Sequence, residues 1–206
     1  MAEVESLAVR SPHAGEFDLD LWRARSPRAD GRRSHKHQAS NTVISAPRRL
    51  SEDTFELDLL VDEDCELMAD HQTGQHLQGM LLIEAARQSF LAVTEMFYLP
   101  DDGTRYYFVF DDLSARYKRF VFPVDARLVY RVRNVDPTPG RQRFTVDVAV
   151  EQCGDEAAVI SGTFTVVKDA RITRMEAGLA REAVNTHVAV AAQARASLRA
   201  RVSEAA

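Results

Sequence analysis

The sequence has few of the residues that cross-link a chain or interrupt regular structure. Its 206 residues include only 2 cysteines, 7 prolines and 9 glycines. Cys65 and Cys153 are too few for a disulfide framework, and neither has a second Cys or a His at zinc-binding spacing. No run approaches about 18 consecutive apolar residues, the length that a membrane-spanning helix needs. These absences exclude a disulfide-rich secreted domain and a helical membrane span.

The chain also lacks a surplus of basic charge. It has 26 Lys and Arg against 31 Asp and Glu, for a formal net charge of -5. Dedicated nucleic-acid-binding proteins usually carry a basic surplus, so we expect no nucleic-acid partner. The first residues are acidic, with Glu3 and Glu5, and no apolar segment of signal-peptide type follows them. We therefore expect a cytoplasmic protein.

Three regions differ in composition. Residues 1–34 mix Ser, Pro, Gly and Arg without a sustained period, which is typical of a partly disordered N-terminal arm. Residues 35–168 carry the hydrophobic patterning of a single domain. Residues 169–206 have no proline and many Ala, Glu and Arg, which favours a helical extension. Apolar side chains recur along it at Ile172, Met175 and Leu179. We expect this extension to pack on the domain or on a second copy.

The middle region alternates between strand and helix signals. Residues 54–59 alternate polar and apolar side chains, as in a half-buried strand. Residues 79–99 are apolar on nearly all sides, so we expect a long helix surrounded by other structure. Residues 100–103 contain Pro and Gly and end that helix. Further strands are expected where β-branched and aromatic residues gather. These segments are 106–110, 114–122, 126–135, 142–151 and 157–168.

This order predicts an α+β fold in which one antiparallel sheet wraps around one long helix. It is the order of elements expected for a hotdog fold. A sheet of this kind leaves an edge open, and pairing two copies edge to edge is one way to satisfy that edge. We therefore expect a homodimer.

The residues with chemical potential cluster around the start of the long helix. His71 and His76 precede it, while Glu84, Arg87 and Gln88 follow at spacings that place them on one helix face. A carboxylate among apolar residues is costly unless it is paired, and Arg87 is within reach. A carboxylate beside an imidazole suits acid–base chemistry at neutral pH. A plain buried ion pair between Glu84 and Arg87 is the structural alternative.

A glycine stands at the predicted beginning of the helix. Gly79 permits a close approach to the backbone, and the N–H groups of a helix start can hold a thioester carbonyl oxygen.

The segment from Asp70 to Gln88 resembles the signature of the A-factor biosynthesis hotdog family (AfsA-like). It reads Asp-His, four residues, His76, two residues, and then Gly-Met-Leu-Leu-Ile-Glu-Ala-Ala-Arg-Gln from Gly79. The resemblance implies a hotdog fold and a role in secondary metabolism. It also implies a thioester substrate on the phosphopantetheine of acyl carrier protein or coenzyme A, with no tightly bound cofactor. Type members transfer a β-ketoacyl group to a three-carbon phosphate on the way to γ-butyrolactones.

The same resemblance implies roles for single residues. His71 and Glu84 correspond to a catalytic pair. The substrate-binding residues would be His76, Gly79, Arg87 and Gln88. No metal ligand is implied.

The chain departs from the family pattern in two respects. Gln78 stands where family loops often carry Pro, and no second copy of the motif follows residue 100. Type members contain two hotdog copies, so a single copy implies that two chains complete the unit. The motif is also similar to that of β-hydroxyacyl-ACP dehydratases. A dehydratase or thioesterase acting on acyl-ACP or acyl-CoA is therefore one alternative, and a non-catalytic acyl-ligand-binding module is another.

Overall fold

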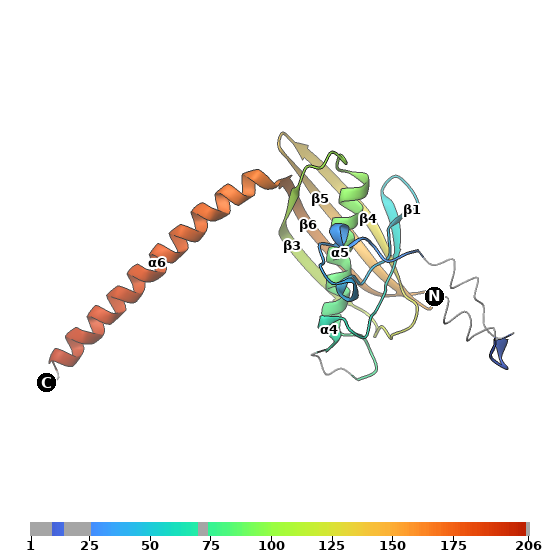
Figure 1. Ribbon diagram of the computed structural model, residues 1–206, viewed down its shortest axis with the longest axis horizontal. Helices are drawn as coiled ribbons and strands as arrows, with labels where there is room; N and C mark the ends of the chain where they lie inside the picture. Colours follow the sequence, from blue (N-terminus) through green and yellow to red (C-terminus); the bar gives the residue numbers. More distant parts are fainter. Residues whose placement is uncertain (1–9, 15–25, 70–73, 205–206) are drawn as a thin grey trace.

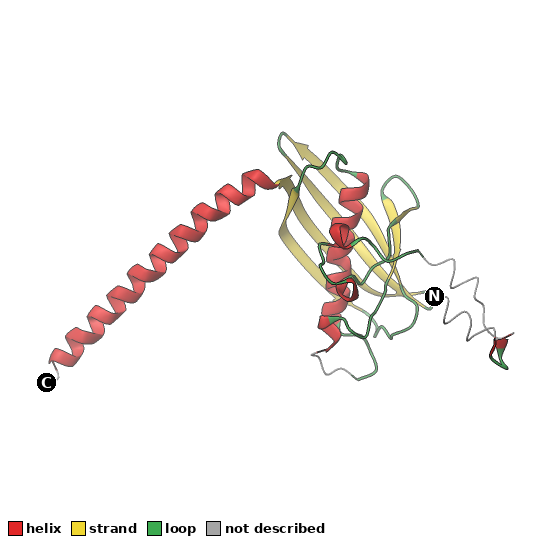
Figure 2. Ribbon diagram, in the orientation of Figure 1, coloured by secondary structure: helices red, strands yellow, loops and turns green. Residues whose placement is uncertain are grey.

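The computed structural model describes residues 10–14, 26–69 and 74–204. Six antiparallel strands form one sheet in the order β1-β2-β4-β5-β6-β3, and the long helix α5 covers one face of it (Figures 1 and 2). This is the predicted α+β hotdog arrangement. Its elements are α3 (Gly31–Ser34), η2 (Ala39–Asn41), β1 (Arg48–Arg49), β2 (Thr54–Asp58), α4 (Glu66–Ala69), α5 (Gly79–Phe97), β3 (Tyr106–Tyr117), β4 (Arg127–Thr138), β5 (Arg141–Gln152), β6 (Asp155–Lys168) and α6 (Asp169–Glu204).

The sheet-facing side of α5 packs into an aromatic core. Phe90 is fully buried and stacks on Phe164 of β6, with 5.5 Å between the ring centroids. Gly162 makes room for this ring, because a Cβ there would lie 3.0 Å from Phe90. Phe164 in turn stacks on Phe144 of β5 at 5.3 Å. The apolar residues of the predicted helix therefore hold it in the curve of the sheet.

The opposite side of α5 is covered by a segment that we call the strap, residues 26–46. Asp30 caps the short helix α3 by accepting a hydrogen bond from the Arg32 N–H at 2.8 Å. The Ala29 N–H donates to the Ile44 carbonyl at 3.0 Å, which ties the two ends of the strap together. The folded body therefore includes residues before the predicted boundary at 34/35. The helical pieces of the strap, α3 and η2, are too short to leave a hydrophobic period that the sequence would reveal.

Two of the predicted strands form one strand. Residues 106–110 and part of 114–122 make up β3, which passes through an irregularity between Phe110 and Asp112 and ends at Tyr117. A bulge at this irregularity adds a residue without ending the ladder, so the two predicted segments are continuous. Among the strands that the structure describes, β3 pairs only with β6 and lies at the edge of the sheet. β4 and β5 are joined by a tight turn at residues 139–140, where Gly140 has a φ of +82°.

The C-terminal extension is a single helix, α6, that projects away from the body (Figure 1). No helix in the described ranges is long and apolar enough to cross a lipid bilayer.

Candidate functional site

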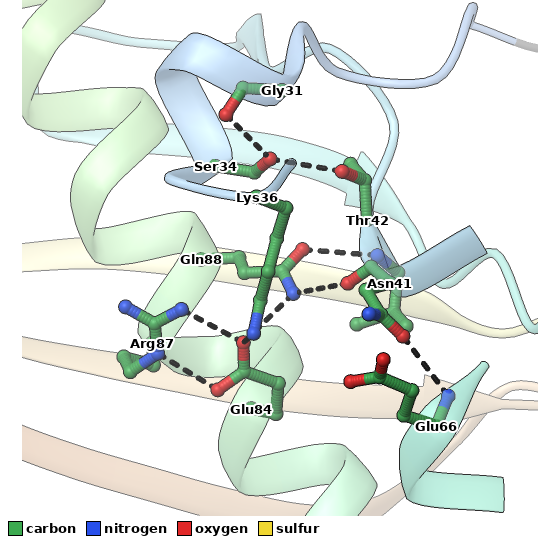
Figure 3. A network of polar contacts seen from close by, with 10 residues as sticks. Gly31, Ser34, Lys36, Asn41, Thr42, Glu66, Glu84, Arg87 and Gln88 are labelled. Atoms are coloured by element: carbon green, nitrogen blue, oxygen red, sulfur yellow. Dashed lines mark hydrogen bonds and ion pairs between the residues drawn. The ribbon is translucent and has the colours of Figure 1, made fainter. Parts of the chain in front are cut away.

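Glu84 lies on the strap-facing side of α5, where three side chains converge on its carboxylate (Figure 3). Arg87, one turn further along the helix, donates from Nε to Oε2 at 2.7 Å and from Nη2 to Oε1 at 2.8 Å. Gln88 donates to Oε1 at 2.9 Å. Lys36, from the strap, places its Nζ 2.8 Å from the same oxygen. Two cations and one amide thus surround a carboxylate whose side chain is only 15% exposed.

These contacts fix the charge of Glu84. Burial by itself raises the pKa of its carboxyl. The hydrogen bonds from Arg87, Gln88 and Lys36 outweigh burial and lower the pKa to about 2. Glu84 is therefore ionised at neutral pH and is a weak proton acceptor. An anion of this kind can orient an imidazole and stabilise its protonated form without taking the proton itself.

The two oxygens of this carboxylate are used unequally. A carboxylate has about four acceptor positions, two on each oxygen. Within the described residues, Oε1 accepts from Arg87, Gln88 and Lys36, whereas Oε2 accepts only from Arg87. Oε2 is therefore the oxygen with an acceptor position left for a further donor.

Gln88 connects the site to the backbone of the strap. Its side chain is fully buried, and its amide oxygen accepts from the Val43 N–H at 2.9 Å. Its amide nitrogen donates to the Asn41 carbonyl at 2.8 Å as well as to Glu84. Asn41 also receives the Glu66 N–H at 2.9 Å on its side-chain oxygen, which links α4 to the same network. Burial of a polar amide is tolerated here because each of its groups is paired.

The start of α5 has a different character. The Tyr117 hydroxyl donates to the Gly79 carbonyl at 2.9 Å, and a Cβ on Gly79 would lie 2.8 Å from the end of that tyrosine. The His76 ring packs against Phe120, with centroids 4.5 Å apart. Phe120 is 68% exposed, and Met80, which follows Gly79 in the chain, is 58% exposed. Apolar side chains therefore dominate the surface around the helix start.

The structure brings part of the predicted site together. Glu84, Arg87 and Gln88 form one network, whereas His76 and Gly79 lie at the helix start. Between His76 and Glu84, both of which are described, no hydrogen bond or ion pair is formed. His71, the predicted imidazole partner, lies outside the described residues.

Sequence reasoning missed two members of this network. Lys36 and Asn41 belong to the strap, and the Asn41–Gln88 bond spans 47 residues. No local pattern signals a contact over that distance. The one available signal was a buried carboxylate and amide on an apolar helix, which require partners from somewhere in the fold.

Neither of two cavities is lined by Glu84, Arg87 or Gln88, although Lys36 borders the second of them. One of about 870 Å³ is bordered by Glu56 and Arg127 on the sheet, and one of about 640 Å³ lies between His35 of the strap and Glu95 of α5. Of the predicted site residues that the structure describes, none lines either cavity. Within the described ranges no group of three or more His, Cys, Asp or Glu side chains is arranged to hold a metal ion.

The fold and the site place the protein among hotdog proteins. The sequence model of the A-factor biosynthesis hotdog domain matches residues 21–168. Because this match spans more than half of the chain, the chain belongs to that family. No curated protein is similar enough to the chain to count as a match.

Several solved structures with a related fold are described as thioesterases or putative thioesterases. A mutant thioesterase from Pseudomonas aeruginosa is 17% identical, with a TM-score of 0.49, over 77% of this chain and 97% of that one. A putative thioesterase related to phenylacetic acid degradation, from Ralstonia eutropha, is 17% identical, with a TM-score of 0.45, over 58% and 82%. A thioesterase from Haemophilus influenzae is 19% identical, with a TM-score of 0.44, over 63% and 81%. At these identities the likeness concerns the fold alone.

Proposed function

We propose that the protein acts on an acyl thioester, as an acyltransferase of the A-factor type. The observation that carries this proposal is its membership of the A-factor biosynthesis hotdog family across residues 21–168, which include the helix-start motif. The acyl group, of β-ketoacyl type, would arrive on the phosphopantetheine of an acyl carrier protein or of coenzyme A. No tightly bound cofactor takes part in this scheme.

In this proposal His71 and Glu84 divide the catalytic work. His71 takes the proton from the acceptor hydroxyl as that oxygen attacks the thioester carbon. Glu84, held as an anion, accepts the other imidazole N–H on Oε2 and stabilises the imidazolium. The C–S bond then breaks, and the imidazolium returns its proton to the leaving thiolate. N–H groups at the start of α5, beside Gly79, hold the negative carbonyl oxygen in between. Arg87 and Gln88 keep Glu84 ionised. His76, at the start of α5, contacts the incoming substrate.

We also propose a homodimer formed through β3. This edge strand is 12 residues long and exposes apolar side chains, including Val109, Phe110, Leu113 and Tyr117. A long apolar edge with unpaired backbone groups is a template for another strand. A second copy would satisfy it by the self-complementary pairing of a two-fold axis.

Turnover of acyl thioesters by point variants tests the chemistry. His71→Ala is expected to lower kcat by about 10²- to 10⁴-fold, the contribution typical of a general base. Glu84→Gln should lower it less, by about 10- to 100-fold, because the imidazole loses an orienting anion but is still present as the base. Glu95→Gln is the matched control on the same helix: its carboxylate binds His35 rather than the network, and turnover should stay within about twofold.

Product analysis by mass spectrometry distinguishes the alternatives. An acylated acceptor supports the transferase, a free acid indicates a thioesterase, and loss of water indicates a dehydratase. Undiminished turnover by folded His71→Ala and Glu84→Gln proteins would overturn the assigned roles. Binding of an acyl thioester without turnover by the wild type would instead favour a non-catalytic binding module.

A further inference from the structure

The helix α6 has far more exposed surface than its attachment to the body explains. It is 36 residues long, or about 54 Å at 1.5 Å per residue. Its first turns are fixed to the sheet: Ile172 is buried, the Asp169 N–H donates to the Arg105 carbonyl at 3.0 Å, and Tyr107 donates to Glu176 at 2.7 Å. From residue 173 to residue 197 its side chains are exposed, apart from the half-buried Ala191.

One face of this projecting helix is apolar. Met175 and Leu179 follow Ile172 at i+3 and i+7, so the three side chains form one row. Ile172 is buried at the attached end of the row, whereas Met175 is 53% and Leu179 is 56% exposed. Helices in water depend mainly on packing of an apolar face, because helix propensity alone stabilises them only marginally. This apolar row therefore requires a packing partner, which the described residues of one chain do not supply.

The position of α6 indicates where that packing partner lies. β6 runs directly into α6, and β6 is the neighbour of the edge strand β3. In Figure 1, α6 leaves the body on the side of the sheet where β3 lies, beyond its unpaired edge. A strand that pairs with β3 would bring its own chain into the space beside α6.

Antiparallel pairing of two β3 strands predicts which surface of the second copy lies beside α6. When two copies of β3 pair along their length, Tyr106 of one lies near Tyr117 of the other. α6 begins beside Tyr106 and Tyr107, because Lys168 is the register partner of Tyr106. The surface that follows Tyr117 on the second copy carries Phe120 and Phe122, which are exposed apolar side chains on a single chain. In such a dimer, two uncovered apolar surfaces would meet across the same two-fold axis.

Charge agrees with this placement. Residues 169–204 contain six arginines and four acidic residues, in a chain with 26 basic and 31 acidic residues in all. The helix α6 is therefore basic, and the remainder of the chain is acidic. Opposite net charges favour the approach of α6 of one copy to the body of another.

We propose that α6 is an exchanged arm: in the dimer formed through β3, Met175 and Leu179 of each chain pack on the Phe120–Phe122 surface of the second copy. This inference rests on the dimer of the proposed function. Because the start of α5 lies under that surface, through the contact of Phe120 with His76, each arm would cover the helix start of its partner.

Sedimentation velocity of the full chain tests the arm. Leu179→Glu is expected to raise the dimer dissociation constant by about 10- to 100-fold, since it places a charge in an apolar contact. Ala177→Glu is the matched control: it adds the same charge to the same exposed helix, but two residues away and therefore on the opposite face. It should change the dissociation constant by less than about twofold. Equal effects of the two substitutions, or none from Leu179→Glu, would overturn the proposal.

Cross-linking tests the contact itself. In a Cys153→Ser background, chains with Leu179→Cys are mixed with chains with Phe120→Cys and treated with a short bismaleimide. A product of twice the chain mass, formed only in the mixture, is expected. Its absence from a protein that is still dimeric would overturn the exchanged arm and leave the β3 dimer standing. A wild type that is monomeric would overturn both, whereas the thioester turnover assay judges the chemistry independently of either result.

Discussion

The strap-facing side of α5 and the start of the same helix are close neighbours that are built in opposite ways. Around Glu84 and Gln88, the carboxylate and the amide are paired with each other, with Arg87 on the same helix and with the strap. Around Gly79, apolar and aromatic side chains such as Phe120 remain exposed, and only one hydrogen bond, from Tyr117, ties the helix start to β3. A satisfied polar network fixes one arrangement of the chain, whereas an exposed apolar surface is suited to binding something else.

The largest expected loss of stability comes from a substitution at the centre of the network around Glu84 and Gln88. Gln88→Leu would leave the buried Val43 N–H and the Asn41 carbonyl without a partner. We expect the free energy of unfolding to fall by about 3 kcal/mol, measured by urea denaturation. Gln38→Leu is the control, because that amide is exposed and meets only Glu66, and its effect should stay within about 0.5 kcal/mol. A loss no larger than the control's would contradict the network.

A second effect appears on acidification. The pKa of Glu84 is lowered to about 2 in the folded chain, from 4.5, so its contribution to stability is complete above about pH 4.5. It is lost as the pH falls through 2. Glu84→Gln should therefore unfold about 2 kcal/mol more easily at pH 7 and show a flatter dependence between pH 5 and pH 2. Unfolding followed by circular dichroism at each pH measures this.

The control for that experiment is an exposed ion pair. Glu156→Gln removes the partner of Lys118 on the surface, which should cost less than about 1 kcal/mol. If the free energy of unfolding falls with pH in parallel for the wild type and Glu84→Gln, the carboxylate contributes no acid-dependent stability.

A smaller effect is expected at the helix start. Gly79→Ala would place a Cβ 2.8 Å from the Tyr117 ring end, so the tyrosine must move and its hydrogen bond is lost. We expect a cost of about 1 kcal/mol in urea denaturation. In a Tyr117→Ala background the same change should cost nothing, because alanine then gains its helix preference over glycine without a clash. A cost that persists there would place its origin in the backbone instead.

The smallest effect on the folding of the single chain is expected from Phe120→Ser. Phe120 is 68% exposed, and its ring packs against His76. Unfolding of the monomer should change by less than about 0.5 kcal/mol, while self-association weakens markedly. Measuring denaturation and sedimentation on the same variant separates the two. A large loss of monomer stability would mean that the helix start is part of the core after all.

Periodic elements were predictable where a single physical rule governs them. The helix expected over 79–99 is Gly79–Phe97, since its apolar residues repeat on all sides and Pro100 prevents its continuation. The grouping of Glu84, Arg87 and Gln88 followed from their spacing along that helix. The strap was not predictable in this way, because its helices α3 and η2 are too short to leave a hydrophobic period. The single strand β3 was divided in the prediction, because a bulge looks like a break in the alternation.

The sequence by itself determined the elements and the family motif, because hydrophobic period, helix-ending residues and the spacing of side chains on one helix are local properties. Only the tertiary structure decided which side of α5 Glu84 faces, that Lys36 and Asn41 complete its surroundings, and that β3 and α6 remain uncovered together. Those outcomes depend on contacts between segments far apart in the chain. Such contacts form only when the sheet has closed around the helix and each buried polar group has found its partner.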